Sequence, residues 1–389
     1  MAGVVVGFVL TACSGSAAVA PERPRSQADT AAVAGPTRGG AGGASPTDGR
    51  GALSAGRRQA GHAQRPPIEP LAPERVLWRF GAGSPVAAAA AVAPDGSVYV
   101  ATSEGKVHGL GADGRHRFTY NIVGAGLGAP GVGADGIVKA GNVLGMLYAL
   151  RPTGRSFWAY STRSAVTTDV VVGPRGYAHL ATMDGRLLGV TGHGGTAYRA
   201  KVPDPVSAGP VLVDDAVVLG TDRGGLLGFR GAKREWRVAL DAPITELVAA
   251  SDGTAYAIGG ETLFAVDRGG QIRWRAGPVE SVGVAPAAQA VAGTWQAALK
   301  WWAADGVPRP TIPIGVTAAD ALGIDAGGCV YVPTVTGDLV VVEPGGQLSS
   351  VHVGNGPLNR PTMDREHSRV VAVSGDGQLL VIEDCHDRG

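Results

Sequence analysis

The sequence of 389 residues contains few aromatic residues and almost no net charge. Aromatic side chains make up 5% of the chain, and 34 Lys and Arg residues against 33 Asp and Glu residues leave a formal net charge of +1. Nucleic-acid-binding surfaces usually show a basic stripe and a high pI, so this balance gives no reason to expect a nucleic-acid partner. The chain has instead 62 glycines and a hydrophobic share of 44%. This composition favours many short strands joined by glycine turns and disfavours helical bundles.

The chain also lacks the local motifs of common active sites and metal sites. Neither a G-x-S-x-G elbow nor a phosphate-binding loop is present. Asp-Gly pairs such as Asp95-Gly96 lack the further oxygen ligands of a calcium loop. His386, beside Asp384 and Cys385, is interpreted as part of a solvated tail. Six other histidines are dispersed along the repeat units and form no convincing sequence-local ligand pair: His108, His116, His179, His193, His352 and His367. We therefore expect no catalytic residues, no metal and no cofactor, and interpret the chain as a non-enzyme.

The N-terminus has the pattern of an export signal. Residues 4–10 form an apolar run too short to span a bilayer, and small residues follow it. Leu10-Thr11-Ala12-Cys13 resembles the lipobox of bacterial lipoproteins, which predicts a signal peptide over residues 1–12 and acylation of Cys13. Ser14 favours the outer membrane, on its periplasmic side, with the cell surface as the alternative. Residues 1–3 contain no Lys or Arg, so a chance apolar N-terminus and a start further upstream stay open.

Residues 13–71 are rich in Ala, Gly, Pro and Ser, with scattered Arg and no apolar periodicity. Such a segment buries too little apolar surface to offset the entropy lost on ordering. We interpret it as a disordered tether between the membrane and a folded domain over residues 72–389.

The folded domain is built from a repeat, which is clearest in residues 251–274, SDGTAYAIGGETLFAVDRGGQIRW. One turn position recurs before an apolar strand in each unit, mostly at a spacing of 40 residues: Gly105, Gly145, Gly185, Gly225, Gly260, Ala297, Gly337 and Gly377. A period near 40 with several strands in each unit is typical of β-propeller blades. We therefore predict an all-β propeller of about eight four-stranded blades. Seven is the alternative if the irregular unit around Ala297 is absorbed.

The two ends of the domain complement each other. Residues 76–80 resemble an outer strand without inner strands before it, and the last unit lacks an outer strand. We expect residues 76–80 to complete the last blade and close the ring, which hides sheet edges that would otherwise pair with other chains.

The repeat resembles the PQQ-binding-like β-propeller repeat, through D-G-x-x-Y-V-x-T followed by G-x-L-x-A-L and a final aromatic strand. The best examples are DGSVYVATSEGKVHGLGADGRHRF from Asp95 and GMLYALRPTGRSFW from Gly145. The family includes quinoprotein alcohol dehydrogenases and BamB-like outer-membrane lipoproteins. Quinoproteins typically carry adjacent cysteines and a calcium-binding set, and this chain has no adjacent cysteine pair. The resemblance to BamB-like lipoproteins implies a scaffold that mediates protein–protein interaction, with the outer-membrane β-barrel assembly machinery as the partner.

Aromatic residues and cysteines have structural interpretations in such a ring. Trp158, Trp236 and Trp274 are expected to dock neighbouring blades onto each other. With Cys13 assigned to lipid, Cys329 and Cys385 are a disulfide candidate in an exported protein. Two separate thiols are the alternative.

The irregular sixth unit carries the main alternative function. Trp295, Lys300, Trp301, Trp302 and Arg309 could form an aromatic and basic patch for a polysaccharide or a small ligand, or a remnant of a quinoprotein-like enzyme. Alternation along a strand sends Trp301 and Trp302 to opposite faces of the blade, so at least one of them is expected to pack.

Overall fold

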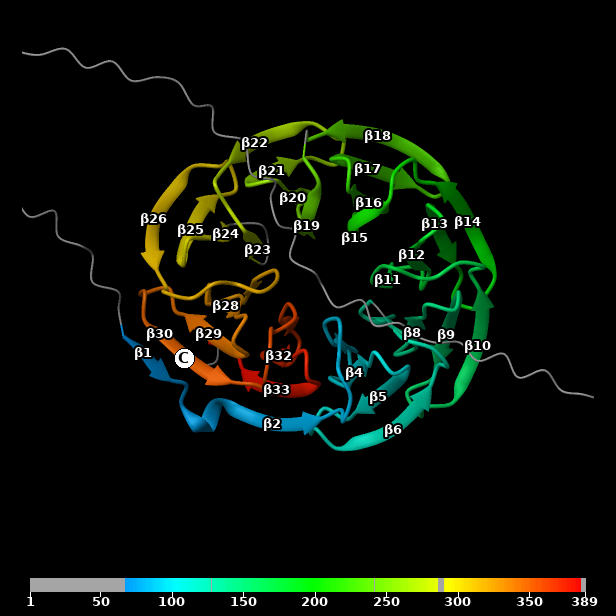
Figure 1. Cartoon of the computed structure of the whole chain (residues 1–389), viewed down its shortest axis with the longest axis horizontal. Helices are drawn as coiled ribbons and strands as arrows, with labels where there is room; N and C mark the ends of the chain where they lie inside the picture. Colours follow the sequence, from blue (N-terminus) through cyan, green and yellow to red (C-terminus); the bar gives the residue numbers. More distant parts are fainter. Residues whose placement is uncertain (1–66, 127, 241, 286–289, 386–389) are drawn as a thin grey trace, which may run out of the picture. The chain divides into compact units, whose positions relative to one another are not determined.

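The computed structural model describes residues 67–126, 128–240, 242–285 and 290–385. Its strands form eight sheets of at least four strands each, arranged as the blades of a closed ring (Figure 1). The predicted all-β propeller is therefore confirmed, with eight blades.

Each blade runs from an inner strand at the ring centre to an outer strand at the rim. Blade 1 is β3 (Ala91–Val92), β4 (Val98–Ala101), β5 (Lys106–Leu110) and β6 (His116–Asn121). Blade 2 is β7 (Gly131–Val132), β8 (Val138–Gly141), β9 (Met146–Leu150) and β10 (Ser156–Ser161). Blade 3 is β11 (Val171–Val172), β12 (Ala178–Thr182), β13 (Arg186–Val190) and β14 (Thr196–Lys201). Blades 4 and 5 are β15 (Val206–Val213), β16 (Ala216–Thr221), β17 (Gly225–Arg230) and β18 (Lys233–Ala239), then β19 (Ile244–Ala249), β20 (Ala255–Gly259), β21 (Thr262–Val266) and β22 (Ile272–Ala276). Blade 6 is β23 (Ser281–Val284), β24 (Ala290–Trp295), β25 (Ala298–Ala303) and β26 (Pro308–Pro313), and blade 7 contains β27 (Gly323–Ile324), β28 (Val330–Pro333), β29 (Asp338–Val342) and β30 (Leu348–His352).

Blade 8 closes the ring with strands from both ends of the domain. It consists of β31 (Thr362–Asp364), β32 (Arg369–Val373), β33 (Gln378–Glu383) and, at its outer edge, β2 (Val76–Gly81), which pairs antiparallel with β33. The predicted closure by residues 76–80 is confirmed.

The fold begins earlier than the boundary predicted at residue 72. β1 (Ile68–Pro70) pairs parallel with β30 and gives blade 7 a fifth strand, and the 3-10 turn η1 (Pro73–Arg75) links β1 to β2. Leu71 is only 6% exposed, in a cluster between blades 7 and 8. Residues 68–71 therefore belong to the propeller, because β1 pairs with β30, Leu71 is buried and Ile68 is partly buried, although the composition of this stretch resembles the tether.

Blade 6 keeps the shape of the repeat without the turn glycine. Gln296 and Ala297 connect β24 to β25 with φ values of 48° and 60°. Two consecutive residues in the left-handed region suit a two-residue hairpin between twisted strands. The irregular unit is thus a complete blade, which excludes the seven-blade alternative.

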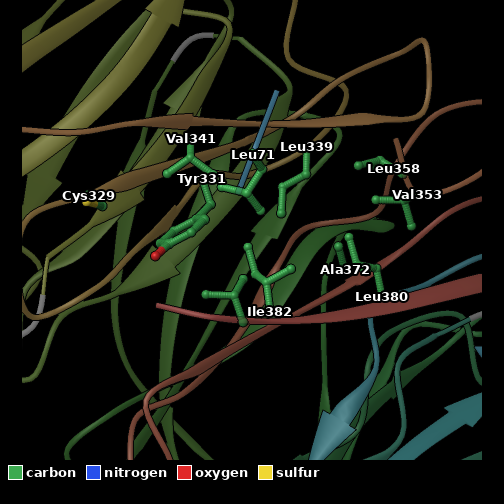
Figure 2. Close-up of a cluster of buried hydrophobic side chains, with 11 residues drawn as sticks. Leu71, Cys329, Tyr331, Leu339, Val341, Val353, Leu358, Ala372, Leu380 and Ile382 are labelled. Atoms are coloured by element: carbon green, nitrogen blue, oxygen red, sulfur yellow. The ribbon is translucent and has the colours of Figure 1, made fainter. Parts of the chain in front are cut away.

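The core lies between neighbouring blades. Every residue of the middle strand β16 is buried, whereas exposure alternates along the outer strand β2. Figure 2 shows one such layer, where Tyr331, Leu339 and Val341 of blade 7 face Leu380 and Ile382 of blade 8. The ring is therefore held by apolar surfaces that each blade buries against the next one.

Aromatic residues on the outer strands add a second contact between blades. The indole Nε1 atoms of Trp78, Trp158, Trp236 and Trp274 donate to a backbone carbonyl in the outer turn of the following blade, at 3.1, 2.7, 3.0 and 2.8 Å. A glycine of that turn lies against each ring, where a Cβ would come within 3.0 Å: Gly114, Gly194, Gly270 and Gly306. Phe118 lies against Gly154 in the same way. The interpretation of Trp158, Trp236 and Trp274 as docking residues is confirmed.

Candidate functional site

Because the strands of each blade alternate in direction, the ring has two distinct faces. One face carries the turns that join the first strand of a blade to the second and the third strand to the fourth. We call it the turn face, and residues 191–195 form one of its turns. We call the opposite face, with the interblade connections and the turns between the second and third strands, the loop face. Among the described residues, three of the eight junctions lack a docked aromatic: those between blades 3 and 4, 6 and 7, and 7 and 8.

At the junction of blades 3 and 4, the docking residue is present but its receiving turn is short. Tyr198 on β14 lies opposite Gly189 of the neighbouring strand, just as the docking residue Trp236 lies opposite Gly228. The outer turn of blade 4 contains only Gly231 and Ala232, whereas the docked turn of blade 3 spans residues 191–195. A Cβ on Gly231 would meet nothing within 4 Å. No turn of blade 4 therefore covers the Tyr198 ring.

The uncovered space is a pocket of about 530 Å³ on the turn face. Tyr198, His179 and Leu212 line it together with Pro174 and Tyr177. The volume lies within the range of about 300–1,000 Å³ typical of ligand sites. The pocket thus offers an aromatic and aliphatic surface that is open to solvent.

A hydrogen bond joins Tyr198 and His179 in this pocket. The Tyr198 hydroxyl lies 2.6 Å from His179 Nδ1, and the rings stack with centroids 5.8 Å apart. Burial lowers the pKa of His179 to about 4 and raises the pKa of Tyr198 above its ordinary value. Near neutral pH both groups are uncharged, and the phenol donates to the imidazole. This pair is suited to binding rather than to proton transfer.

Charged residues of both signs surround the pocket. Asp215 lies 3.8 Å from Arg175 and 4.0 Å from Arg230, and Asp214 lies 3.3 Å from Arg268. These side chains are largely exposed, so their pairs contribute little to stability. They remain available to a charged ligand.

The junction of blades 6 and 7 holds part of the predicted aromatic and basic patch. β26 carries Arg309 between two prolines and has no docking aromatic. A pocket of about 480 Å³ lies there, and Trp301, Arg309, Asp325 and Glu343 are among its lining residues. Trp301 and Arg309 are paired across β25 and β26.

The other members of the predicted patch lie elsewhere. Trp302 is 5% exposed in the cluster shared with blade 5. The Lys300 ammonium lies 5.9 Å from the Trp295 ring and donates to the carbonyl of Pro278 at 2.9 Å. The five residues therefore divide into a pocket pair, Trp301 and Arg309, a separate cation–π pair, and one core residue.

The loop-face mouth of the central channel is crossed by an ion pair. Arg360, before β31, lies 2.6 Å from Asp169, before β11, and its backbone N–H donates to Asp320 at 2.8 Å. Glu246 faces the same hollow of about 220 Å³. Desolvation raises the pKa of Glu246 to about 8, although the Val282 N–H hydrogen bond acts in the opposite direction. The Arg360 contacts connect blades 3, 7 and 8 across the ring centre, and the Glu246 contact joins blade 5 to blade 6.

Large apolar side chains are exposed on the loop face. Val123, Leu144 and Met183 are 67%, 64% and 70% exposed, on the connections and turns of blades 1 to 3. Val123 has a φ of 47°, which is costly for a β-branched residue. The buried Asn142 amide donates to the carbonyls of Ile122 and Val123, at 2.9 and 2.7 Å, and holds this conformation. Leu144 lies against Gly124, next to Val123 in the chain, and contiguous exposed apolar surface is typical of protein contact sites.

The junction of blades 7 and 8 is fastened by sulfur and polar contacts. The structure joins Cys329, before β28, to Cys385, after β33, in a disulfide with a Cα–Cα distance of 6.2 Å. The backbone N–H of Cys385 donates to Asp325 and to the Tyr331 hydroxyl, each at 3.0 Å. Burial, followed by the Asp325 charge, raises the pKa of Tyr331.

Within the part of the chain that the structure describes, one group of three residues has metal-ligand proximity: Asp325, Cys329 and Cys385. We assign no metal to it, because both sulfur atoms belong to the disulfide.

Two expectations concern residues outside the described ranges. Cys13, with the signal peptide and most of the tether, and His386 of the C-terminal cluster lie there. Among the described residues, no helix has the length and apolar character needed to cross a membrane.

Comparison with known proteins supports the family resemblance. No family model matches the sequence. The chain is 30% identical over 185 residues to the outer membrane protein assembly factor BamB of Burkholderia pseudomallei, a match that covers 44% of this chain and 48% of that protein. The crystal structure of BamB from Moraxella catarrhalis superposes with a TM-score of 0.66 at 17% identity, over 79% of this chain and 99% of that chain. The chain is thus an eight-bladed β-propeller that is similar to BamB in part of its sequence.

Other solved propellers share the fold of this BamB-like chain. Sqt1 of Saccharomyces cerevisiae has a TM-score of 0.68 at 12% identity, and the computationally designed protein Ika8 has a TM-score of 0.66 at 16% identity, each over 79% of this chain. Identities this low show the fold alone. The sequence match spans about half the length of the curated BamB relative, so the function of this BamB-like chain needs its own argument.

Sequence analysis did not identify His179 and Tyr198 of the BamB-like propeller as pocket residues. The signal was a change in spacing. Thirteen residues separate the turn glycine Gly185 from Tyr198, but only 12 separate Gly224, the glycine at this turn of blade 4, from Trp236. A shorter interval between turn and aromatic indicates a shorter outer turn, and with it an uncovered ring on the preceding blade.

Proposed function

We propose that this protein is a non-catalytic, lipid-anchored propeller scaffold that assists the assembly of β-barrel proteins in the outer membrane. The observation that carries the proposal is the similarity in sequence to a protein named as an outer-membrane assembly factor. The propeller fold, which spans nearly the whole of a BamB structure, supports it. Acylation of Cys13 would place the scaffold at the membrane, with the folded ring tethered to it.

The loop face supports the interaction part of this proposal. Leu144 packs beside Gly124, where a Cβ would lie 2.8 Å from its side chain, so Leu144 adjoins the strained Val123 loop. A rigid ring can present such residues without ordering a loop on binding, which lowers the entropic cost of association. We therefore assign Val123, Leu144 and Met183 to the surface that contacts a protein partner.

The test is cross-linked recovery of partners from solubilised outer membranes. The unaltered protein should recover components of the barrel-assembly machinery. The double variant Leu144→Ser with Met183→Ser should recover them at least about tenfold less efficiently, as expected for residues central to an interface. Val307→Ser is the matched control, because Val307 is also exposed, at 56%, but lies in an outer turn of the turn face.

The proposal fails if no protein partner is recovered and the purified protein instead binds to a glycan array. That result would favour the pocket of Trp301 and Arg309 as a polysaccharide site.

A further inference from the structure

The pocket between blades 3 and 4 occupies the place where other junctions hold a polypeptide turn. Tyr198 has the register of a docking aromatic, and the rings of Trp158, Trp236 and Trp274 are covered in their junctions by turns of the following blade. The turn of blade 4, Gly231 and Ala232, leaves Tyr198 uncovered. The rest of the chain therefore shows which kind of structure fits against this ring.

The covering turns share a geometry. Each has a glycine in the left-handed region, with φ values of 81° for Gly194, 83° for Gly270 and 87° for Gly306. The glycine is required, because a Cβ would come within 3.0 Å of the aromatic ring. A turn that settles on Tyr198 in this manner would need the same residue at the same place.

The contact does not need a hydrogen bond from the aromatic side chain. The Tyr198 hydroxyl is already bonded to His179 at 2.6 Å. Phe118 has no donor, yet it lies against Gly154 of the next blade in the docked arrangement. The Tyr198 ring face is sufficient, with Leu212 and Tyr177 as further apolar walls.

The surrounding charges match the composition of such turns. The turn in blade 5 contains Asp267 and Arg268 beside its glycines. The pocket presents Arg175 and Arg230 together with Asp214 and Asp215. Opposite charges on a turn and a pocket rim favour encounter and orientation more than affinity.

We propose that the pocket between blades 3 and 4 binds a tight, glycine-containing turn of another polypeptide, in place of the outer turn that blade 4 lacks. This is a second protein-binding site, on the turn face, separate from Leu144 and Met183 on the loop face. Its test does not use the assembly machinery, so its failure and the failure of the scaffold function are distinguishable.

The probe is a cyclised peptide with the sequence of residues 266–272, VDRGGQI, labelled for fluorescence anisotropy. The protein is the full chain with Cys13→Ser. We expect saturable binding below about 1 mM, the weak end of specific association. The control peptide carries Gly270→Val and should bind at least about tenfold more weakly, since the added side chain meets the ring.

Two protein variants locate the site. In the first, residues 230–233 are replaced by DRGGQ, which follows the equivalent strand pair in blade 5, so that the new turn should cover Tyr198 from within the chain. In the second, Leu212→Trp enlarges a side chain that lines the pocket and alters no turn. Each should weaken peptide binding at least about tenfold, with an unchanged circular dichroism spectrum. The second variant keeps the test decisive if the first does not fold.

Equal binding of the two peptides, binding that survives both variants, or no saturation up to about 1 mM would each overturn the proposal.

Discussion

The junctions of blades 2 and 3 and of blades 3 and 4 differ in one turn. At the first, Trp158 donates to the Gly192 carbonyl at 2.7 Å and lies against Gly194. At the second, Tyr198 faces a pocket of about 530 Å³ and bonds to His179 of its own blade. The apolar layers between the sheets continue through both junctions. Docking is therefore an addition to the core, and a blade can lose it without leaving the ring.

A hollow by itself does not distinguish the two junctions. A depression of about 570 Å³, lined in part by Phe157, Tyr177 and His193, also lies between blades 2 and 3. What differs is the docking aromatic, which a turn covers at one junction and not at the other. A docking aromatic that no turn of the next blade covers therefore marks a candidate binding site in such a repeat.

The junction of blades 7 and 8 replaces docking with a covalent bond, and breaking this bond should have the largest effect. The disulfide of Cys329 and Cys385 joins residues 56 apart. In the chain-entropy account, removing it from a loop of this length costs about 4 kcal/mol of unfolding free energy. We expect Cys329→Ser with Cys385→Ser to show this loss in urea denaturation.

Cys13→Ser is the control for this experiment, because it removes a cysteine that lies outside the described propeller residues. Peptide mapping of the unreduced protein should show the two cysteines linked. Finding both as free thiols would contradict the bridge and the predicted loss together.

Removing the docking aromatics directly tests the difference between the two neighbouring junctions. Trp158→Ala should lower the free energy of unfolding by about 3 kcal/mol, as for other large aromatic truncations. Tyr198→Ala should cost about 1 to 2 kcal/mol less, because Tyr198 makes no ring contact or hydrogen bond with a turn of the next blade. Trp158→Phe should cost only about 1 kcal/mol, since it removes the hydrogen bond but keeps a ring. Equal losses for Trp158→Ala and Tyr198→Ala in urea denaturation would mean that docking adds nothing.

The arrangement of blades could be predicted from sequence because it depends on local chemistry repeated at a fixed period. Gly105 and its equivalents mark turns, and alternating apolar residues mark the strands between them. Even Ala297 could be placed as a turn by counting from its neighbours. Ring closure by β2 followed from complementary ends, since an unpaired outer strand and an incomplete blade require each other.

The remaining features depend on contacts between segments far apart in sequence. β1 has three residues, one of them proline, and pairs with a strand about 280 residues away, so it carries no alternating pattern. The division of the predicted patch into Trp301 with Arg309 and Lys300 with Trp295 depends on which side each strand presents to its neighbour. The uncovered Tyr198 was detectable from the shorter spacing in blade 4, but only after the docking contact was known.

The smallest predicted effect on the free energy of unfolding is its dependence on pH through His179, at the uncovered junction of blades 3 and 4. Burial at the uncovered junction lowers the pKa of His179 from 6.5 to about 4. The unfolded chain therefore binds a proton more readily than the folded chain as the pH falls below about 6.5, and this difference removes stability. Between pH 7.5 and pH 5.5, His179 should account for a loss of about 1 kcal/mol of unfolding free energy.

Other groups titrate over the same interval, so the measurement is the difference between the unaltered protein and His179→Gln. The variant should lose about 1 kcal/mol less than the unaltered protein over this range. Parallel curves would show that His179 is protonated in the folded state as readily as in the unfolded one, and that the junction is wetter than its geometry indicates.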